Sequence, residues 1–312
     1  MAEITIIGTG AMALYFGSRL AAAGDRVRLL GSWQEGIDAI NRNGICVVNN
    51  AGKKYYPAEA SADPGKFPST RLALVLVKSW QTKDAARLLE AVLEPDGIVL
   101  TLQNGLGNAE ILTTTLGEEQ VAHGVTTYGA TVQGPGTVRS GGEGVISVQQ
   151  HARLTPLIQT LRRSGLEVQE VSDITSILWS KLVINVAINP LTGIMGVKNG
   201  RLLDSPAAMK IMGLAAREAA EVAGVLGIML DIKDPGRQAE QVAAATAENI
   251  SSMLQDIRRN APTEIDALCG SVVRAGRMVD LPTPVNEILM FMIRAKEDIT
   301  RNANHENRGN DF

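Results

Sequence analysis

A glycine-rich turn near the N-terminus constrains this chain more than any other feature. The stretch IIGTGAMA places Gly8, Gly10 and Ala13 in a G-x-G-x-x-A spacing between an apolar run and a helical pattern. The first glycine allows a tight turn, the second lets the backbone approach a pyrophosphate, and the third small residue lets helix and strand pack closely. The alternative is a glycine turn without a ligand. At the start of a βαβ series we expect a dinucleotide site instead, with these contacts: Gly8, Thr9, Gly10, Ala11, Met12 and Ala13.

The first half of the chain alternates short apolar runs with helical patterns. The runs at 3–8, 26–31, 71–78 and 97–105 are nearly continuous, as in parallel strands that are covered on both faces. A hairpin at 44–57 and antiparallel strands between 124 and 148 interrupt this rhythm. The pattern predicts an α/β fold with a doubly wound, Rossmann-type sheet over residues 1–171.

The second half, residues 172–312, shows long helical patterns with almost no strand pattern. We therefore expect a smaller, all-helical domain that carries the substrate and the catalytic groups. Its last residues, 303–312, are polar and are predicted to be a frayed tail.

Composition excludes several classes of function. Thirty basic residues against thirty-three acidic ones leave a net charge of −3, which argues against a nucleic-acid partner. The isolated Cys46 and Cys269, with three scattered histidines, indicate neither a disulfide framework nor a metal site. We find no signal peptide and no long uninterrupted apolar run, so we expect a cytoplasmic protein without a membrane partner.

A polar stripe crosses an otherwise apolar helical pattern at 180–191, SKLVINVAINPL. Lys181, Asn185 and Asn189 follow an i, i+4, i+8 spacing and share one helix face, while Pro190 is expected to end the helix. Burying such groups unpaired costs about 1–3 kcal/mol each. They could form a satisfied structural network or a wet helix face, or they could line a cleft between the two domains. In a cleft, a lysine ammonium could stabilise the alkoxide that develops when hydride reaches a ketone, and could supply its proton.

Two further candidate site residues directly follow apolar runs that are predicted strands. In a doubly wound sheet, ligands bind at the carboxyl ends of the strands. Lys78 comes after LALVLV, and Asn104 comes after GIVLTLQ. Lys78 could equally be a lysine at a strand end with its head in water, and Asn104 a turn residue. After the second strand, where an acidic residue suits NAD and an arginine suits NADP, the chain has Ser32 and Gln34. Arg28 is expected within the strand, so cofactor preference stays open.

The chain resembles the ketopantoate reductase family over nearly its whole length, from Ile4 to about Arg294. The motifs IIGTGAMA, VKSWQ, QNGLGN, SKLVINVAINPLTGI and ENISSMLQDI, followed by TEID, occur in the order and spacing of that family. The resemblance implies reduction of the ketone of ketopantoate (2-dehydropantoate) to D-pantoate, in the route to pantothenate and coenzyme A. It implies NADPH as cofactor, with NADH as an option.

The resemblance also implies roles for single residues. Lys181 resembles the general acid, and Glu264 the acidic residue that holds lysine, substrate and cofactor in register. Ser252 resembles a ligand of the substrate carboxylate. Without the resemblance, Ser252 and Glu264 would be interpreted as ordinary capping residues, Glu264 in the first turn of a helix. Asn185, Asn189 and Asn199 resemble the family's substrate-positioning amides. Lys78 and Asn104 resemble contacts on the nicotinamide side of the cofactor, and Asn104 also resembles a substrate ligand.

One departure from the family and two alternatives remain. Family members often have an arginine after the second strand, where this chain has Ser32. One alternative is a reductase of another branched 2-keto acid, and the other is a non-catalytic dinucleotide sensor. The long apolar helices could also support a homodimer.

Overall fold

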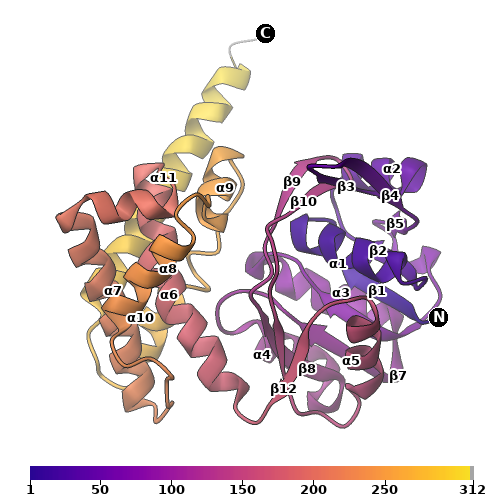
Figure 1. Ribbon diagram of the computed structural model, residues 1–312, viewed down its shortest axis with the longest axis horizontal. Helices are drawn as coiled ribbons and strands as arrows, with labels where there is room; N and C mark the ends of the chain where they lie inside the picture. Colours follow the sequence, from indigo (N-terminus) through magenta and orange to yellow (C-terminus); the bar gives the residue numbers. More distant parts are fainter. Residues whose placement is uncertain (310–312) are drawn as a thin grey trace. The chain divides into compact units, whose positions relative to one another are not determined.

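The computed structural model of the protein describes the backbone of residues 1–309 and the side chains of residues 1–301. The tail expected over 303–312 therefore lies outside the fully described residues. The chain divides into two compact units (Figure 1). The first unit contains residues 1–103 and 107–174, and the second contains 104–106 and 175–312. A three-residue segment that follows a strand of the first unit thus belongs to the second.

An eight-stranded sheet forms the centre of the first unit. Consecutive residues of its central strands belong to different apolar clusters, Ile6 to one and Ile7 to the other. Because side chains alternate across a strand, both faces of the sheet are covered, which explains the continuous apolar runs. In spatial order the strands are β12 (Val168–Val171), β11 (Ile146–Gln149), β8 (Val121–Thr126), β7 (Leu93–Thr101), β6 (Thr70–Val75), β1 (Glu3–Ile7), β2 (Arg26–Leu30) and β5 (Glu59–Ser61).

Helices cover both faces of this sheet, as a doubly wound fold requires. All neighbouring strands pair in parallel except β11 and β8, which are antiparallel. One face packs against α1 (Ala11–Ala22) and α5 (Thr155–Arg163), the other against α3 (Thr82–Val92) and α4 (Asn108–Leu116). The predicted α/β class, with a Rossmann-type sheet followed by a helical region, is confirmed.

A second, four-stranded sheet lies over α1. The predicted hairpin is present as β3 (Ile45–Asn49) and β4 (Gly52–Tyr56). It continues through β10 (Thr137–Ser140) to β9 (Ala130–Gly134), an antiparallel pair, with β10 parallel to β3. Gly17 on α1 lets this sheet approach, because a Cβ there would lie 2.9 Å from Ile45 Cδ1. The remaining short elements are α2 (Gln34–Asn43), η1 (Pro64–Lys66), η2 (Ser79–Gln81) and η3 (Glu118–Gln120).

Helices make up the described elements of the second unit. At its centre lies α6 (Ile174–Met195), whose Val183, Val186 and Ala187 are fully buried. Among the described residues, α6 is the helix long and apolar enough to cross a membrane, but most of it is buried inside the unit. Core packing therefore accounts for its composition. The other elements are η4 (Asn199–Asp204), α7 (Pro206–Val225), α8 (Pro235–Ala245), α9 (Ser252–Arg258), α10 (Cys269–Met278) and α11 (Pro284–Gly309).

Two local predictions in this unit are wrong. Pro190 does not end α6, which continues to Met195. A proline inside a helix costs about 3 kcal/mol, but the following Leu191 and Thr192 are buried, so the continued helix recovers packing. Glu264 does not lie in a helix, because α10 begins only at Cys269 and residues 264–268 form turns.

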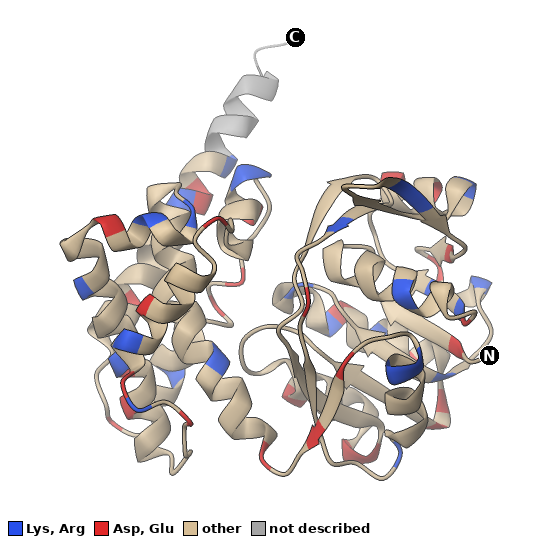
Figure 2. Ribbon diagram, in the orientation of Figure 1, with Lys and Arg blue, Asp and Glu red and all other residues tan. Residues whose placement is uncertain are grey.

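Residues with charges of both signs are interspersed along the elements of both units (Figure 2). This distribution follows from the near balance of basic and acidic residues in the chain.

Candidate active site

Three polar residues from distant parts of the chain meet in the second unit. The Lys181 ammonium donates a hydrogen bond to Asn104 Oδ1 at 2.7 Å. Asn104 Nδ2 in turn approaches Glu264 Oε2 at 3.5 Å. The carboxamide therefore bridges an ammonium and a carboxylate. We call Lys181, Asn104 and Glu264 the lysine cluster.

Glycine at position 105 allows Asn104 to reach this cluster. Gly105 has a left-handed φ of +81°, and a Cβ there would lie 2.7 Å from Ala267 Cβ and closer still to the Ala267 carbonyl oxygen. The next residue, Leu106, donates its N–H to the same carbonyl oxygen at 3.1 Å. The segment 104–106 is thus laid directly on the turn that carries Glu264.

Gln103 fixes the strand end from which this segment leaves the first unit. Its Nε2 donates to the Val77 carbonyl at 3.1 Å and to Thr82 Oγ1 at 2.9 Å, and its Oε1 accepts from Thr101 Oγ1 at 2.9 Å. The ends of β6 and β7 are thereby tied together. Sequence reasoning missed Gln103; its position just before Asn104, in a strand-end turn, is the feature that could have suggested it.

Burial and charge set the protonation of Lys181. Burial lowers the pKa of Lys181 from its usual value of 10.5 to about 8, and the Glu264 carboxylate opposes this shift. Glu264 is itself buried, with 6% of its surface exposed. At neutral pH the amine is therefore protonated, but it gives up its proton more readily than an ordinary lysine. These are the properties of a general acid that operates near pH 7.

We expect this pKa to appear in the pH dependence of catalysis. With Lys181 as the proton donor in a ketone reduction, kcat/KM should be level below about pH 8 and fall above it, because only the protonated amine can donate. In the reverse direction, alcohol oxidation, the lysine must accept a proton, so the rate should rise through the same pH range. Glu264→Gln removes the charge that raises the Lys181 pKa, so both limbs should move to lower pH. Profiles measured in both directions test this; limbs that stay in place in Glu264→Gln would contradict it.

The two carboxamides on α6 are available for a ligand. Asn185 is partly buried, and Asn189 is 9% exposed. In the described part of the chain neither carboxamide forms a hydrogen bond with another protein group, whereas Lys181 of the same stripe is bonded to Asn104. Asn185 lies one helical turn beyond Lys181, and Asn189 lies two turns beyond it, on the same face of α6.

Asn199 has a fixed orientation and one free acceptor. Thr246 Oγ1 donates its proton to the Val242 carbonyl at 2.7 Å, so it accepts from Asn199 Nδ2, at 2.9 Å. Asn199 Oδ1 is left buried without a hydrogen-bond partner among the described residues. A buried acceptor of this kind is costly unless a ligand or water donates to it.

Ser252 is not the helix cap that its sequence position suggests. The preceding residue, Ser251, caps α9 by accepting from Leu254 N–H at 3.1 Å. Ser251 also accepts from Thr192 Oγ1 at 2.7 Å, which ties the start of α9 to α6. The Ser252 hydroxyl forms no hydrogen bond within the described residues and can serve a ligand. Sequence reasoning missed Ser251 and Thr192.

The glycine-rich turn of the first unit suits a dinucleotide. Gly8 has φ +127°, and a Cβ there would lie 3.2 Å from the Leu76 backbone, whereas a Cβ at Gly10 would meet nothing within 4 Å. The first glycine is thus required by the fold, and the second leaves open space beside the backbone. Gly10 is the N-cap of α1 and provides no side chain to bond the first-turn N–H groups, which remain for phosphate oxygens. Ala13 is fully buried, as close packing of helix and strand requires.

Comparison with known proteins identifies the family. Residues 4–153 match the family described as "Ketopantoate reductase PanE/ApbA", and residues 173–297 match its C-terminal part. A 2-dehydropantoate 2-reductase of Pyrococcus horikoshii is 33% identical over 302 residues, covering 95% of this chain and 98% of that protein. The chain belongs to the ketopantoate reductase family.

Solved structures of other proteins have the same fold as this chain. A PanE/ApbA family ketopantoate reductase from Ralstonia eutropha has a TM-score of 0.89 and 30% identity, covering 96% of this chain and 99% of that one. A D-mandelate dehydrogenase, solved with NADH and anilino(oxo)acetate, also has a TM-score of 0.89, with 28% identity and coverage of 95% and 98%. The same fold therefore occurs in an enzyme named for a different substrate.

The residues after β2 in this member of the family carry no charge suited to a 2′-phosphate. Arg28 is buried within β2, as expected, where it pairs with Glu3 and lies 5.6 Å from the Phe67 ring centroid. Ser32 is exposed, and Gln34 Nε2 donates to Asp38 at 2.7 Å. Lys78 precedes η2, its N–H donating to Gln81 Oε1 at 3.3 Å.

Proposed function

We propose that this member of the ketopantoate reductase family reduces 2-dehydropantoate to D-pantoate with a reduced nicotinamide cofactor, in the route to pantothenate and coenzyme A. The observation that carries the proposal is the lysine cluster, a half-buried ammonium hydrogen-bonded to a carboxamide beside a buried carboxylate. A non-catalytic dinucleotide sensor would need the glycine turn but not this cluster. Burying an ammonium without a task would only cost stability.

The chain's own residues supply binding and proton transfer. Gly8, Thr9, Gly10, Ala11, Met12 and Ala13 would hold the cofactor, which when bound supplies the hydride. Lys181 would donate its proton to the ketone oxygen as negative charge develops there. Asn104 and Glu264 would hold the ammonium in place, and Asn104, Glu264 and Lys78 would also contact the nicotinamide side of the cofactor.

Uncharged side chains of the second unit would bind the rest of the substrate. We assign the substrate carboxylate to Ser252, whose hydroxyl has no hydrogen bond to the described residues, and the other oxygens to Asn104, Asn185, Asn189 and Asn199. Residues 1–171 would thus act as the dinucleotide-binding domain and 172–312 as the substrate and catalytic domain. Turnover would require both to meet around the reacting atoms and to exclude water.

Cofactor oxidation followed at 340 nm tests this function directly. With NADPH and then NADH, we expect 2-dehydropantoate to have the highest kcat/KM among 2-keto acids. 2-Ketoisovalerate and an aromatic 2-keto acid are the comparison substrates, because a D-mandelate dehydrogenase shares the fold. A clear preference for either comparison acid would favour a related 2-keto acid reductase, our second candidate, and binding of cofactor without any oxidation would favour the sensor.

Ser32 should weaken discrimination between the two cofactors. We propose NADPH as the cofactor, with NADH accepted, because no acidic residue repels a 2′-phosphate at this position. Ser32→Arg should raise the NADPH to NADH ratio of kcat/KM by about tenfold, through a charge-assisted hydrogen bond worth about 1.4 kcal/mol. Ser32→Gln, which is long but neutral, is the control. An equal gain in both variants, or a gain for NADH, would contradict this role.

We further propose that the enzyme acts in the cytoplasm on a small-molecule 2-keto acid, without nucleic-acid or membrane partners. Cys46 and Cys269 are both free and buried, as is common for cytosolic proteins. A homodimer stays a prediction; the half-exposed Phe291 and Met292 on α11 are apolar groups that a second subunit could cover.

A further inference from the structure

One turn of α11 is tied to both segments that carry the lysine cluster's ionisable groups. Lys296 Nζ donates to the carbonyls of Gly193 and Ile194, at 2.8 and 3.0 Å, at the end of α6. The next residue, Glu297, accepts the Thr263 backbone N–H at 2.6 Å. Adjacent side chains thus bind the helix that carries Lys181 and the turn that carries Glu264.

Glu297 binds the backbone of Thr263, the residue that precedes Glu264. Thr263 is buried, and its Oγ1 accepts from Ile265 N–H at 3.3 Å, so the backbone from 263 to 265 forms a closed turn around Glu264. Because the turn is closed, a displacement of Thr263 carries Glu264 with it. The tie is short and its acceptor is a carboxylate, which makes it a stronger bond than one between neutral groups.

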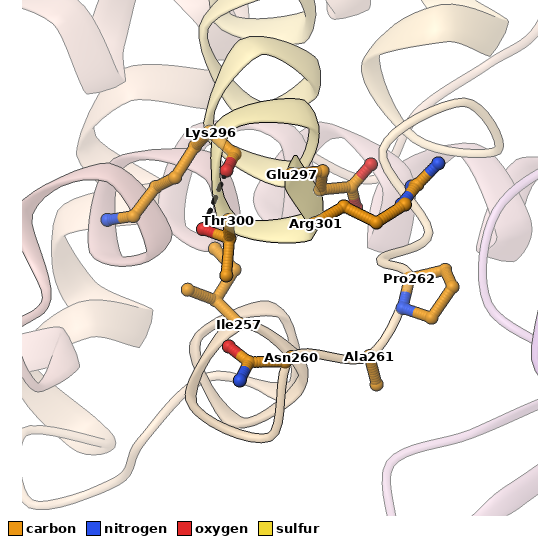
Figure 3. A pocket seen from close by; sticks show the side chains of 8 residues that line it. All are labelled: Ile257, Asn260, Ala261, Pro262, Lys296, Glu297, Thr300 and Arg301. Carbon is orange, nitrogen blue, oxygen red and sulfur yellow. Dashed lines mark hydrogen bonds between the residues drawn. The ribbon is translucent and has the colours of Figure 1, made fainter. Parts of the chain in front are cut away.

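Packing supports this turn unevenly on the side toward α11: the residues before Glu264 border a hollow, whereas Ile265 packs in the same core as Ile293 of α11. The residues just before it, Asn260 to Pro262, border a hollow of about 60 Å³ together with Ile257, Glu297 and Arg301 (Figure 3). Binding sites for metabolites have volumes of about 300–1,000 Å³, so the hollow has room only for water. Asn260 also has a left-handed φ of +52°. The part of the turn before Glu264 therefore depends on the Thr263–Glu297 hydrogen bond, whereas the part after it is held by core packing and by the ion pair of Asp266 with Arg294.

We propose that Glu297 is a positioning residue, which through the Thr263 N–H holds Glu264 at its place beside Asn104 and Lys181. Its catalytic consequence rests on the proposed function, but its structural consequence does not. The charged groups that line the hollow with Glu297 are Lys296 and Arg301, and the charged group that faces Lys181 is Glu264. A change in the charge of Glu297 must therefore be separated from a change in position.

Three variants make that separation. Glu297→Ala removes the acceptor, whereas Glu297→Gln removes the charge but keeps an oxygen that can accept from Thr263. Asp298→Ala, at an exposed neighbouring position of α11, is the control for loss of one negative charge. The readout is the pKa of Lys181, obtained from the pH dependence of its acylation by acetic anhydride and mass spectrometry. This measurement needs no substrate, so it stays valid even if the protein reduces no keto acid.

We expect Glu297→Ala to lower the pKa of Lys181, because a displaced carboxylate no longer raises it, while Glu297→Gln and Asp298→Ala stay close to the wild type. In the enzymatic assay, Glu297→Ala should reduce kcat by about tenfold or more, as misplacement of a catalytic group does. An unchanged Lys181 titration in Glu297→Ala would overturn the proposal, and so would an equal shift in Glu297→Gln. If Glu297→Ala does not fold, Glu297→Asp takes its place, because it withdraws the carboxylate by one methylene. The pKa of Lys181 must then be lowered in Glu297→Asp, and a wild-type pKa of Lys181 in that variant would also overturn the proposal.

Discussion

Replacing Lys181 by alanine is expected to lower kcat for keto acid reduction by about 10²- to 10⁴-fold, the usual contribution of a general acid. In the proposed mechanism, the variant loses both the proton donor and the positive charge that would stabilise the developing alkoxide. Cofactor affinity, measured by fluorescence titration, should change little, because the glycine turn belongs to the other compact unit of the chain. Steady-state kinetics with 2-dehydropantoate provide the measurement.

Lys210→Ala is the matched control for this prediction. Lys210 lies exposed on α7, in the same unit, so its loss removes an equal charge without touching the lysine cluster. It should keep wild-type kcat. Near-normal turnover in Lys181→Ala would refute the assignment of the general acid, and an equal loss in Lys210→Ala would show that net charge alone explains the effect.

Gly105→Ala is expected to cause the second large loss, about 100-fold in kcat, with a lower melting temperature. A methyl group at this position would collide with the Ala267 backbone, and the left-handed φ of +81° adds strain of about 1–2 kcal/mol for any residue other than glycine. To relieve the collision, the segment 104–106 must lift away from the turn. Asn104 would then leave Lys181 and Glu264, which it bridges.

Gly107→Ala separates these two causes. Gly107 has a similar φ of +89°, but a Cβ there would meet nothing within 4 Å. It should therefore show the conformational cost in its melting temperature and keep most of its activity. Equal activity losses in the two variants would mean that backbone strain, and not the position of Asn104, limits catalysis.

Local periodicity made much of the fold predictable. The glycine turn, the apolar runs and the helical spacing each depend on residues a few positions apart, and such patterns are visible in the chain itself. The same holds for the stripe of Lys181, Asn185 and Asn189, because i, i+4 and i+8 share a helix face wherever the helix lies. Most of the strands and helices, and the candidate general acid, could therefore be named in advance.

Other features depended on neighbours that no local pattern contains. The predicted end of α6 was wrong, because the tendency of Pro190 to stop a helix was outweighed by the burial of the residues after it. The prediction that Glu264 lies in the first turn of a helix was wrong, because turns precede α10 at this point of the chain. The resemblance to the ketopantoate reductase family pointed to Glu264 and Ser252, but it did not reveal Ser251, Gln103 or Glu297.

The sequence by itself thus determined the sheet, the helical region, the glycine turn and the face on which the lysine lies, because these follow from short-range spacing. Only the tertiary structure decided which groups that lysine meets. Asn104 is 77 residues from Lys181 and 160 residues from Glu264 along the chain. Their contact results from long-range packing of the segment 104–106 on the turn at Ala267, and the chemistry of the ammonium depends on that contact.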